Sequence, residues 1–222
     1  MSNELFETQD GSHSLFSEAH GVSYHSKYGA VQETQHVFIN AALRFKALLQ
    51  SDLHILDIGF GTGLNAYMTL LEAQKRNLTI HYTAIEAYPI SLELATTLNY
   101  SEVLNQLELQ PLFLQMHTSE WSQPLALTEN FNFQKEKIYF EQLDFSNQFD
   151  IIYFDAFSPN SQPELWEADL MESMYRALKT DGVLVTYCAK GVVKRTMKAV
   201  GFEIEALKGP PGKREMTRAL KI

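Results

Sequence analysis

The residues whose types and spacing could do chemistry begin with three glycines and a nearby acid. Gly59, Gly61 and Gly63 lie in "ILDIGFGTGLN" (residues 55–65), directly after an apolar run that contains Asp57. Glycines can adopt positive φ and let backbone N–H groups approach a ligand, and a helix that starts here would point its positive end at that ligand. The pattern predicts a binding loop for a nucleotide-like ligand at the carboxyl end of a strand.

The spacing of the glycines separates two classes of nucleotide ligand. A dinucleotide fingerprint has the form G-x-G-x-x-G, and its third glycine would fall at Leu64. The spacing present is G-x-G-x-G, which resembles the first motif of S-adenosylmethionine-dependent methyltransferases, in which an acid placed like Asp57 often lies near the methionyl ammonium. Glu86 ends the next predicted strand, and a carboxylate there can accept hydrogen bonds from both hydroxyls of an adenosine ribose.

A second group of chemically capable residues lies in "YFDAFSPNSQPELW", residues 153–166. Asp155 is expected at the carboxyl end of the strand predicted at 149–157, where it can orient or deprotonate an amine, because an ammonium cannot attack a methyl donor until it loses a proton. Phe157 could flank a flipped-out base or the cofactor. The alternative is that Asp155 caps a turn and Phe157 packs in the core.

The elements that must position these residues alternate between strand and helix. Apolar strands are predicted at 53–59, 79–87, 149–157 and 182–189, with helices at 64–77, 91–100 and 163–182. This order predicts an α/β fold with a doubly wound, mostly parallel sheet and helices on both faces. Residues 201–222 predict two strands joined by a Gly/Pro turn, forming an antiparallel hairpin at the edge of the sheet.

Two segments are less regular than the rest. The N-terminal segment is an irregular lead followed by a helix with apolar residues at Phe38, Ala41, Ala42, Phe45, Leu48 and Leu49. Residues 111–140 have no clear periodicity and are assigned only loosely. Because no repeat or Gly/Pro/Ser linker divides the sequence, residues 1–222 are expected to form a single domain.

Composition excludes several classes of protein. The only cysteine, Cys188, rules out a disulfide framework, and no spacing of histidine and cysteine indicates a metal site, so no structural metal is expected. No apolar run reaches the ~18 residues of a membrane span, and none has the form of a signal peptide. The sequence therefore predicts a soluble cytoplasmic protein with no membrane partner.

The charge of the chain is distributed unevenly. The net charge of −9 argues against a polyanionic partner, yet residues 179–222 contain ten Lys and Arg residues against four acids. Such asymmetry is expected of an enzyme whose basic end faces nucleic acid phosphates. A solvated basic helix followed by a basic hairpin would give the same distribution.

Four segments, taken in order and spacing, give a narrower resemblance. They are "GVSYHSKYGAVQETQHVFI" (21–39), "ILDIGFGTGLN" (55–65), "DAFSPNSQPELW" (155–166) and "GPPGKREM" (209–216). Together they resemble the methyltransferase domain of the MnmC family of tRNA wobble-uridine modification enzymes, over nearly the whole chain. The resemblance implies methylation of the 5-aminomethyl group of a wobble (2-thio)uridine, with S-adenosylmethionine as cofactor and tRNA as partner.

The same resemblance implies roles for particular residues. S-adenosylmethionine would be held by Glu33, Asp57, Gly59, Phe60, Gly61, Gly63, Asn65, Glu86, Gln142 and Asp155. Asp155 would also be catalytic, beside the transferred methyl group, while the lead segment with Lys27 and Glu33 folds over the cofactor. The substrate RNA would be contacted by Phe157, Lys190, Lys213 and Arg214, although cations beside a glycine turn are often merely solvated.

The sequence departs from the family in two respects. The bifunctional enzymes carry a flavin-dependent oxidase domain, which 222 residues cannot accommodate, so only the methylation is expected, after a separate enzyme has generated the amine. In "FEQLD" (140–144), where the family usually offers an acid to the adenine amino group, Gln142 lies between Glu141 and Asp144. Which residue binds adenine is left open.

Two other functions remain as alternatives. A small-molecule amine methyltransferase or an aminopropyltransferase of the same fold is compatible with Glu33, Asp155 and the acidic net charge, whereas the basic C-terminal segment and the four motifs argue against it. A non-catalytic module that binds RNA or a nucleotide is argued against by three retained acids, Asp57, Glu86 and Asp155, because such a module has no need of them.

Overall fold

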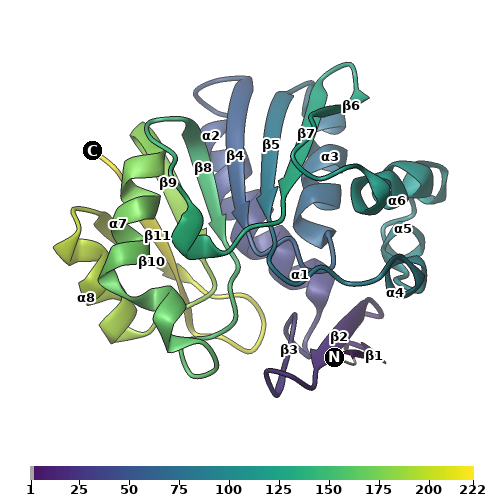
Figure 1. Ribbon diagram of the computed structural model, residues 1–222, viewed down its shortest axis with the longest axis horizontal. Coiled ribbons are helices and arrows are strands. Elements are labelled where there is room, and N and C mark those ends of the chain that lie inside the picture. Colours follow the sequence, from purple (N-terminus) through teal and green to yellow (C-terminus); the bar gives the residue numbers. More distant parts are fainter. Residues whose placement is uncertain (1–2) are drawn as a thin grey trace.

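The computed structural model, which describes residues 3–222, is built on an eight-stranded sheet in the order β10-β11-β9-β8-β4-β5-β7-β6 (Figure 1). Its strands are β4 (Asp52–Ile58), β5 (Thr79–Ile85), β6 (Leu125–Thr128), β7 (Phe131–Glu136), β8 (Phe149–Phe154), β9 (Leu178–Thr186), β10 (Glu203–Lys208) and β11 (Glu215–Leu220). The five strands from β9 to β7 pair in parallel, while β10, β11 and β6 pair antiparallel at the two edges. The predicted doubly wound sheet and its C-terminal hairpin are confirmed.

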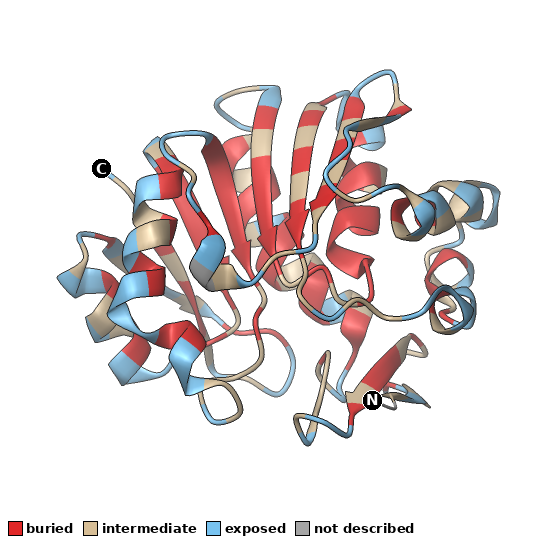
Figure 2. Cartoon of the chain, viewed as in Figure 1, coloured by how far each residue is buried: buried red, intermediate tan, exposed pale blue. Residues whose placement is uncertain are grey.

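The strand order reverses at β4, which has β5 on one side and β8 on the other. In a parallel sheet the loops that leave the strands at such a point diverge, and they open a crevice at the carboxyl ends. The central strands are buried on both faces, as Figure 2 shows for β8, because helices cover each side. Along β4, Ile55 and Leu56 accordingly pack into two different hydrophobic clusters, one on each face.

The helices divide between the two faces of the sheet. They are α1 (Ala30–Thr34), the π-helix η1 (Gln35–Leu43), α2 (Arg44–Lys46), α3 (Leu64–Arg76), α4 (Leu92–Thr96), α5 (Tyr100–Val103), the 3₁₀ turns η2 (Leu107–Leu109), η3 (Phe140–Gln142) and η4 (Pro163–Trp166), α6 (Gln110–Thr118), α7 (Ala168–Ala177) and α8 (Gly191–Ala199). In Figure 1, η1 and α3 lie behind the sheet, and α7 and α8 lie in front. Within the part of the chain that the structure describes, no helix combines the length and apolarity needed to cross a bilayer.

The first helical segment runs without a break through α1, η1 and α2, but its buried face differs from the predicted one. Leu48 and Leu49 were expected to continue the apolar stripe, and this was wrong, because the segment ends at Lys46 and the two leucines are 80% and 72% exposed. The π turns of η1 bond i to i+5 and so shift which side chains face the sheet. Lys46 is buried instead, and its Nζ donates to the carbonyl of Asp181 over 3.0 Å.

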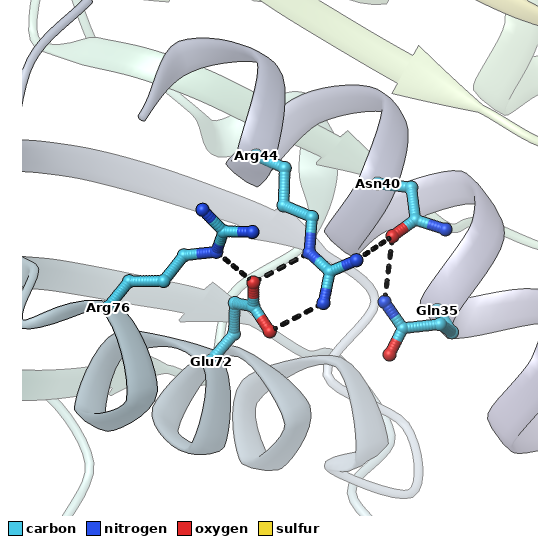
Figure 3. Close-up of polar contacts among 5 residues, drawn as sticks. All are labelled: Gln35, Asn40, Arg44, Glu72 and Arg76. Atoms are coloured by element: carbon cyan, nitrogen blue, oxygen red, sulfur yellow. Dashed lines mark hydrogen bonds and ion pairs between the residues drawn. The ribbon is translucent and has the colours of Figure 1, made fainter. Parts of the chain in front are cut away.

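A polar network fastens this segment to α3, the helix that follows the glycine loop (Figure 3). Arg44 donates from Nε and Nη2 to the two carboxylate oxygens of Glu72, over 2.6 and 2.9 Å, and Arg76 donates to the same carboxylate. The bond from Arg44 holds the pKa of Glu72 below its usual value. Asn40 accepts from both Arg44 and Gln35. Two-point pairs of this kind fix orientation, so α3 is anchored on its outer side.

The N-terminal lead contains a small sheet that the sequence did not predict. Strands β1 (Asn3–Glu7), β2 (His13–Ser17) and β3 (Val22–Ser23) pair antiparallel. Asp10, in the β1–β2 turn, accepts N–H bonds from Ser12 (3.1 Å) and Gln32 (2.9 Å), and so joins the turn to α1. Leu15 of β2 is fully buried in the main core. The expectation of an irregular lead was therefore partly wrong.

Three further segments differ in detail from the prediction. The loosely assigned residues 111–140 hold most of α6 together with β6 and β7. The helix predicted over 91–100 is divided into α4 and α5. The helix predicted over 163–182 is a 3₁₀ turn followed by α7, and Leu178 begins β9, because it pairs with Phe149 at the amino end of β8. Tertiary pairing overrides the helical spacing at this position.

Candidate active site

The glycine loop connects β4 to α3 and follows a left-handed course. Gly59 and Gly61 have φ of +98° and +51°, values that residues with side chains rarely adopt. A Cβ on Gly59 would lie 3.0 Å from the carbonyl oxygen of Asp155, and one on Gly61 would lie 3.1 Å from the ring of Tyr24. Glycine is therefore required at these two positions, because the loop after β8 and the lead segment both pack closely against the backbone.

A cavity of about 180 Å³ opens above this loop, at the carboxyl ends of β4, β5 and β8. Its wall includes seven of the residues expected to bind cofactor or substrate: Gly59, Phe60, Gly61, Asn65, Glu86, Asp155 and Phe157. Gly63 begins α3 just behind, where a Cβ would lie 2.9 Å from Nε2 of His117. The fold therefore brings together three loops that lie far apart in the sequence.

Glu86 lies at the end of β5 and is held by the backbone. Its Oε2 accepts from the N–H of Gly61 and its Oε1 from the N–H of Tyr88, each over 2.8 Å. Burial raises the pKa of this carboxyl, against the effect of these N–H bonds. Each carboxylate oxygen has a second lone pair, so the group can accept further bonds from hydroxyls inside the cavity.

Asp57 lies on β4, fully buried behind the loop and not on the cavity wall that the structure describes. Its Oδ2 accepts from the Tyr82 hydroxyl over 2.7 Å, while Oδ1 has no hydrogen-bond partner among residues 3–222. Burial raises the pKa of Asp57 to about 7, even though the Tyr82 and Asn65 bonds lower it. An unsatisfied buried carboxylate oxygen is unusual, and it favours a cationic ligand close by.

Asp155 follows β8 and faces the cavity as predicted. Its Oδ2 accepts from Nδ2 of Asn65 (2.9 Å), whose Oδ1 accepts in turn from the Thr34 hydroxyl (3.1 Å). Burial, and then the nearby charges of Glu33 and Asp57, raises the pKa of Asp155 well above its usual value. Of these three carboxyl groups Asp155 lines the cavity, with Asp57 and Glu33 buried close enough to act on its charge, so this position favours a positively charged ligand over a neutral one.

Glu33, on α1, is buried, and its carboxylate is already paired. Oε2 accepts from the N–H of Ser26 (2.8 Å), and Oε1 accepts from Nζ of Lys213 (2.6 Å). The same ammonium lies 3.9 Å from the ring centroid of Tyr187. Lys213 was expected to contact RNA phosphate, but here its charge is directed inward at Glu33. Lys27, expected in the segment over the cofactor, is exposed.

Three more of the predicted residues lie outside the cavity wall. Lys190 and Arg214 are both exposed, and Lys190 donates to Asn160 in the loop that follows β8. Oε1 of Gln142 accepts from the N–H of Tyr139 (3.0 Å), and it is Tyr139 and Phe140 that line the cavity instead. The roles of Lys190, Arg214 and Gln142 stay predictions, and the side chain of Glu141 lies outside the described part of the chain.

Apart from Phe60 and Phe157, the sequence analysis did not single out the aromatic side chains that surround the cavity. His20 and Tyr24 of the lead segment pack on Phe157, with ring centroids 4.8 and 5.2 Å away, and Tyr88 meets Tyr139 edge to face at 5.9 Å. The available signal for Tyr24 was the density of His and Tyr in "GVSYHSKYG" (21–29), which the resemblance had already marked, whereas nothing in the sequence marked His20, Tyr88 or Tyr139. Flat side chains on two sides suit a planar base or a planar ring of a cofactor.

His25 is a further residue that sequence analysis missed. It is buried on the cavity wall, with Nε2 2.8 Å from the hydroxyl of Thr62 in the glycine loop. Burial lowers the pKa of His25 to about 4, so the ring is neutral at physiological pH. This histidine therefore links the lead segment to the loop as a neutral hydrogen-bonding group.

One group of potential metal ligands lies elsewhere, at the amino ends of β4 and β5. Asp52, His54 and His81 bring one ligand atom each to within 4.8 Å of one another, and the two imidazoles stack with centroids 4.3 Å apart. These side chains are partly or largely exposed. The expectation that the protein has no structural metal stays a prediction.

Comparisons with known proteins show the family of the chain. A family model described as S-adenosyl-L-methionine-dependent methyltransferase matches residues 112–222. The chain is 31% identical over 208 residues to the tRNA 5-methylaminomethyl-2-thiouridine biosynthesis bifunctional protein MnmC of Marinomonas sp. (strain MWYL1), a match that covers 87% of this chain and 30% of the relative. The chain spans about a third of the length of the curated relatives it matches.

Solved structures resemble the fold over its whole extent. MnmC2 from Aquifex aeolicus is 25% identical, with a TM-score of 0.77, and the match covers 98% of this chain and 70% of that one. Spermidine synthase from Thermotoga maritima, 14% identical with a TM-score of 0.58, matches 100% of this chain and 72% of its own. The second likeness concerns the fold alone.

Proposed function

The chain belongs to the S-adenosyl-L-methionine-dependent methyltransferases, and from this premise we propose that it methylates the 5-aminomethyl group of a wobble (2-thio)uridine in tRNA. The product would be 5-methylaminomethyl-(2-thio)uridine. The relatives that carry the name MnmC support this substrate, as does the match to MnmC2 over almost the whole chain. The observation that carries the proposal is the carboxyl group of Asp155, presented to a cavity built on a methyltransferase-type glycine loop.

The residues around the cavity fit S-adenosylmethionine. Oδ1 of Asp57 is a buried acceptor that lacks a partner within the described chain, as a nearby ammonium would require. Glu86 offers carboxylate oxygens for ribose hydroxyls, and the bare backbone at Gly59 and Gly61 leaves room for close approach. When bound, S-adenosylmethionine supplies an activated methyl group on a positively charged sulfur. We propose Asp57, Glu86 and the glycine loop as its principal holders.

Asp155 is proposed to act on the acceptor amine. An aminomethyl group is an ammonium at neutral pH, and it becomes nucleophilic only after it loses a proton. The carboxylate of Asp155 can attract the ammonium, orient it by a hydrogen bond and accept the proton. Asn65 fixes the direction of this carboxylate, since it donates to Oδ2. Alignment of this kind, together with exclusion of water, can supply ~7–11 kcal/mol of rate enhancement.

The RNA would approach over the rim that Phe157 and α8 share. Phe157 is partly exposed beside His20 and Tyr24, where a flipped-out base could stack. Lys190 joins the amino end of α8 to the loop after β8, and exposed Arg214 lies on the β10–β11 turn. We propose these cations as phosphate contacts. A tRNA substrate would place the enzyme in the cytoplasm, and the amine would be generated by another modification activity.

We further propose that residues 1–222 act as one domain. Leu15 of the small N-terminal sheet is buried in the main core, and the π-helical segment packs against β8, β9 and β11. The lead segment therefore completes the cavity wall through His20, Tyr24 and His25. Removal of the residues before α1 should therefore abolish cofactor binding and also lower the stability of the main core, because Leu15 is lost from it.

Nucleoside mass spectrometry would test the function directly. Transfer RNA carrying 5-aminomethyl wobble uridine is incubated with the purified protein and S-adenosylmethionine, and the nucleosides are analysed after digestion. Appearance of 5-methylaminomethyluridine is the expected result. A parallel reaction supplies decarboxylated S-adenosylmethionine and diamines. Binding of S-adenosylmethionine without change in the tRNA, or aminopropyl transfer in the parallel reaction, would overturn the proposal.

A further inference from the structure

We propose that Lys213 fills a cation site beside Asp155 and thereby restricts the acceptor to molecules that present a single amine. The proposal rests on the proposed function, in that it assigns Asp155 to the acceptor amine. It adds a residue that sets specificity without touching the methyl donor. It also bears on the alternative function named above, an aminopropyltransferase, whose acceptor would be a diamine.

The cation site has two walls of different chemistry. Glu33 supplies a buried carboxylate, 8% exposed, whose Oε1 lies 2.6 Å from Nζ of Lys213. Tyr187 supplies the face of an aromatic ring, 3.9 Å from the same nitrogen. A carboxylate opposite an aromatic face is the environment that binds an alkylammonium well. In this protein the alkylammonium is the side chain of the chain's own lysine.

The site lies next to the amine-binding carboxylate. The Tyr187 hydroxyl donates to the carbonyl of Ala156 over 2.9 Å, directly after Asp155. Both Glu33 and Lys213 are close enough to act on the charge of Asp155, the first raising its pKa and the second lowering it. Two anionic positions, Glu33 and Asp155, therefore adjoin one another, and among the described residues only that of Glu33 is paired with a cation of the protein.

Lys213 is held in this position by its loop. The turn between β10 and β11 is closed by N–H bonds from Gly209 to Arg214 (3.1 Å) and from Lys213 to Pro210 (2.9 Å). The ring of Tyr28 packs so closely on Gly212 that a Cβ there would lie 2.1 Å from it. The tip of the hairpin is thus seated on the lead segment, which also carries Glu33 into place.

The consequence for substrate choice follows from the charges. A diamine gains affinity over a monoamine when a second carboxylate binds its second ammonium. Because Lys213 already neutralises Glu33, an entering diamine would have to place its distal ammonium beside another cation. An aminomethyl group on RNA has no second ammonium and meets no such repulsion. Lys213 thus disfavours polyamines while leaving the monoamine position at Asp155 open.

Amine binding to the Lys213→Ala variant tests this inference. Calorimetric titrations use the full chain with S-adenosylmethionine and compare propylamine with 1,3-diaminopropane, 1,4-diaminobutane and 1,5-diaminopentane. In the variant, the best diamine should gain at least about tenfold in affinity relative to propylamine, the value of one charge-assisted hydrogen bond. The wild-type protein should show no such preference. The series of chain lengths reports the spacing of the two sites.

Two companion variants make the result specific. Lys213→Met keeps the apolar stem of the side chain but removes its charge, so it separates electrostatic exclusion from mere filling of space. Glu33→Gln combined with Lys213→Ala should lose the diamine preference, because the second carboxylate is gone. Equal affinities for diamine and propylamine in folded Lys213→Ala would overturn the inference. The titrations contain no tRNA, so they remain interpretable if the wobble-uridine assay fails.

Discussion

Two buried aspartates at opposite ends of the same parallel sheet have contrasting environments. Asp150, at the amino end of β8, is 5% exposed, and its Oδ2 accepts from Nζ of Lys179 and from the N–H of His54, each over 2.8 Å. Although burial raises the pKa of Asp150, these bonds bring it below its usual value. Asp57, near the carboxyl end of β4, keeps one oxygen without a partner in the described chain, and burial raises its pKa to about 7.

The contrast shows how one sheet separates stability from function. At the amino end the charge of Asp150 is balanced within the chain, as a structural carboxylate requires. At the carboxyl end Asp57 and Asp155 are desolvated with few cations nearby, which destabilises their charged forms in the free protein. A cationic ligand would reverse that effect, so binding energy is available where the fold leaves charge unbalanced. Perturbed carboxyl groups in a cavity are typical of a functional site.

The largest expected effect is on turnover, from a substitution of Asp155 at the carboxyl end of the sheet. Asp155→Asn should lower kcat by about a hundredfold or more, because the amide can neither accept the proton nor attract the ammonium. Binding of S-adenosylmethionine should persist, and it can be followed by calorimetry beside the tRNA assay. Asp169→Asn, at an exposed residue in the first turn of α7, is the matched control and should leave kcat unchanged. Normal turnover by Asp155→Asn would remove the proposed role of this carboxyl.

A substitution beside Asp150, at the amino end of the sheet, should lower stability and leave kcat unchanged. Lys179→Met leaves the buried carboxylate of Asp150 without its ion pair, which should lower the free energy of unfolding by about 1–3 kcal/mol. Urea unfolding followed by circular dichroism measures this loss. Methyl transfer at a temperature where the variant is folded should equal that of the wild type. A fall in kcat without a loss of stability would show that the two ends are coupled.

A third expected effect is a difference in how stability depends on pH. Asp57 keeps its proton in the folded chain up to about pH 7, but in the unfolded chain only up to about pH 3.8. The folded state therefore binds more protons between these values, and this group's contribution is fully present below pH 3.8 and lost as the pH rises towards 7. Asp57→Asn should remove a slope of up to about 1.4 kcal/mol per pH unit.

The partner measurement uses Asp150→Asn, for which the sign is reversed. Because the pKa of Asp150 is lowered on folding, its contribution is present above the unfolded value and is lost only as the pH falls through the folded one. Unfolding free energies at pH 5, 6 and 7 should thus differ from wild type by a changing amount for Asp57→Asn and by a constant amount for Asp150→Asn. Parallel curves for both variants would contradict the contrast between the two ends.

The fold and the candidate site could be predicted from the sequence where the local residue pattern agrees with the tertiary structure. The glycine spacing, the apolar strands and Glu86 at a strand end predicted the cavity, because a parallel sheet gathers the carboxyl ends of its strands at one edge. The prediction of a helix over 163–182 failed where Leu178 pairs with β8, and the predicted stripe through Leu48 and Leu49 failed because the helical segment, which contains π turns, ends at Lys46. Neither the pairing nor the π turns have a signature in local periodicity.

What the sequence determined by itself is the class of protein and the chemistry of its loop, since these depend on residue types at short spacing. Only the tertiary structure decided which charges meet. Lys213 and Glu33 are 180 residues apart, and nothing local distinguishes an inward lysine from a solvated one. The orphaned oxygen of Asp57 likewise depends on every side chain packed around it. Charge balance is a property of the packed chain, because desolvation and pairing act through space and not along the sequence.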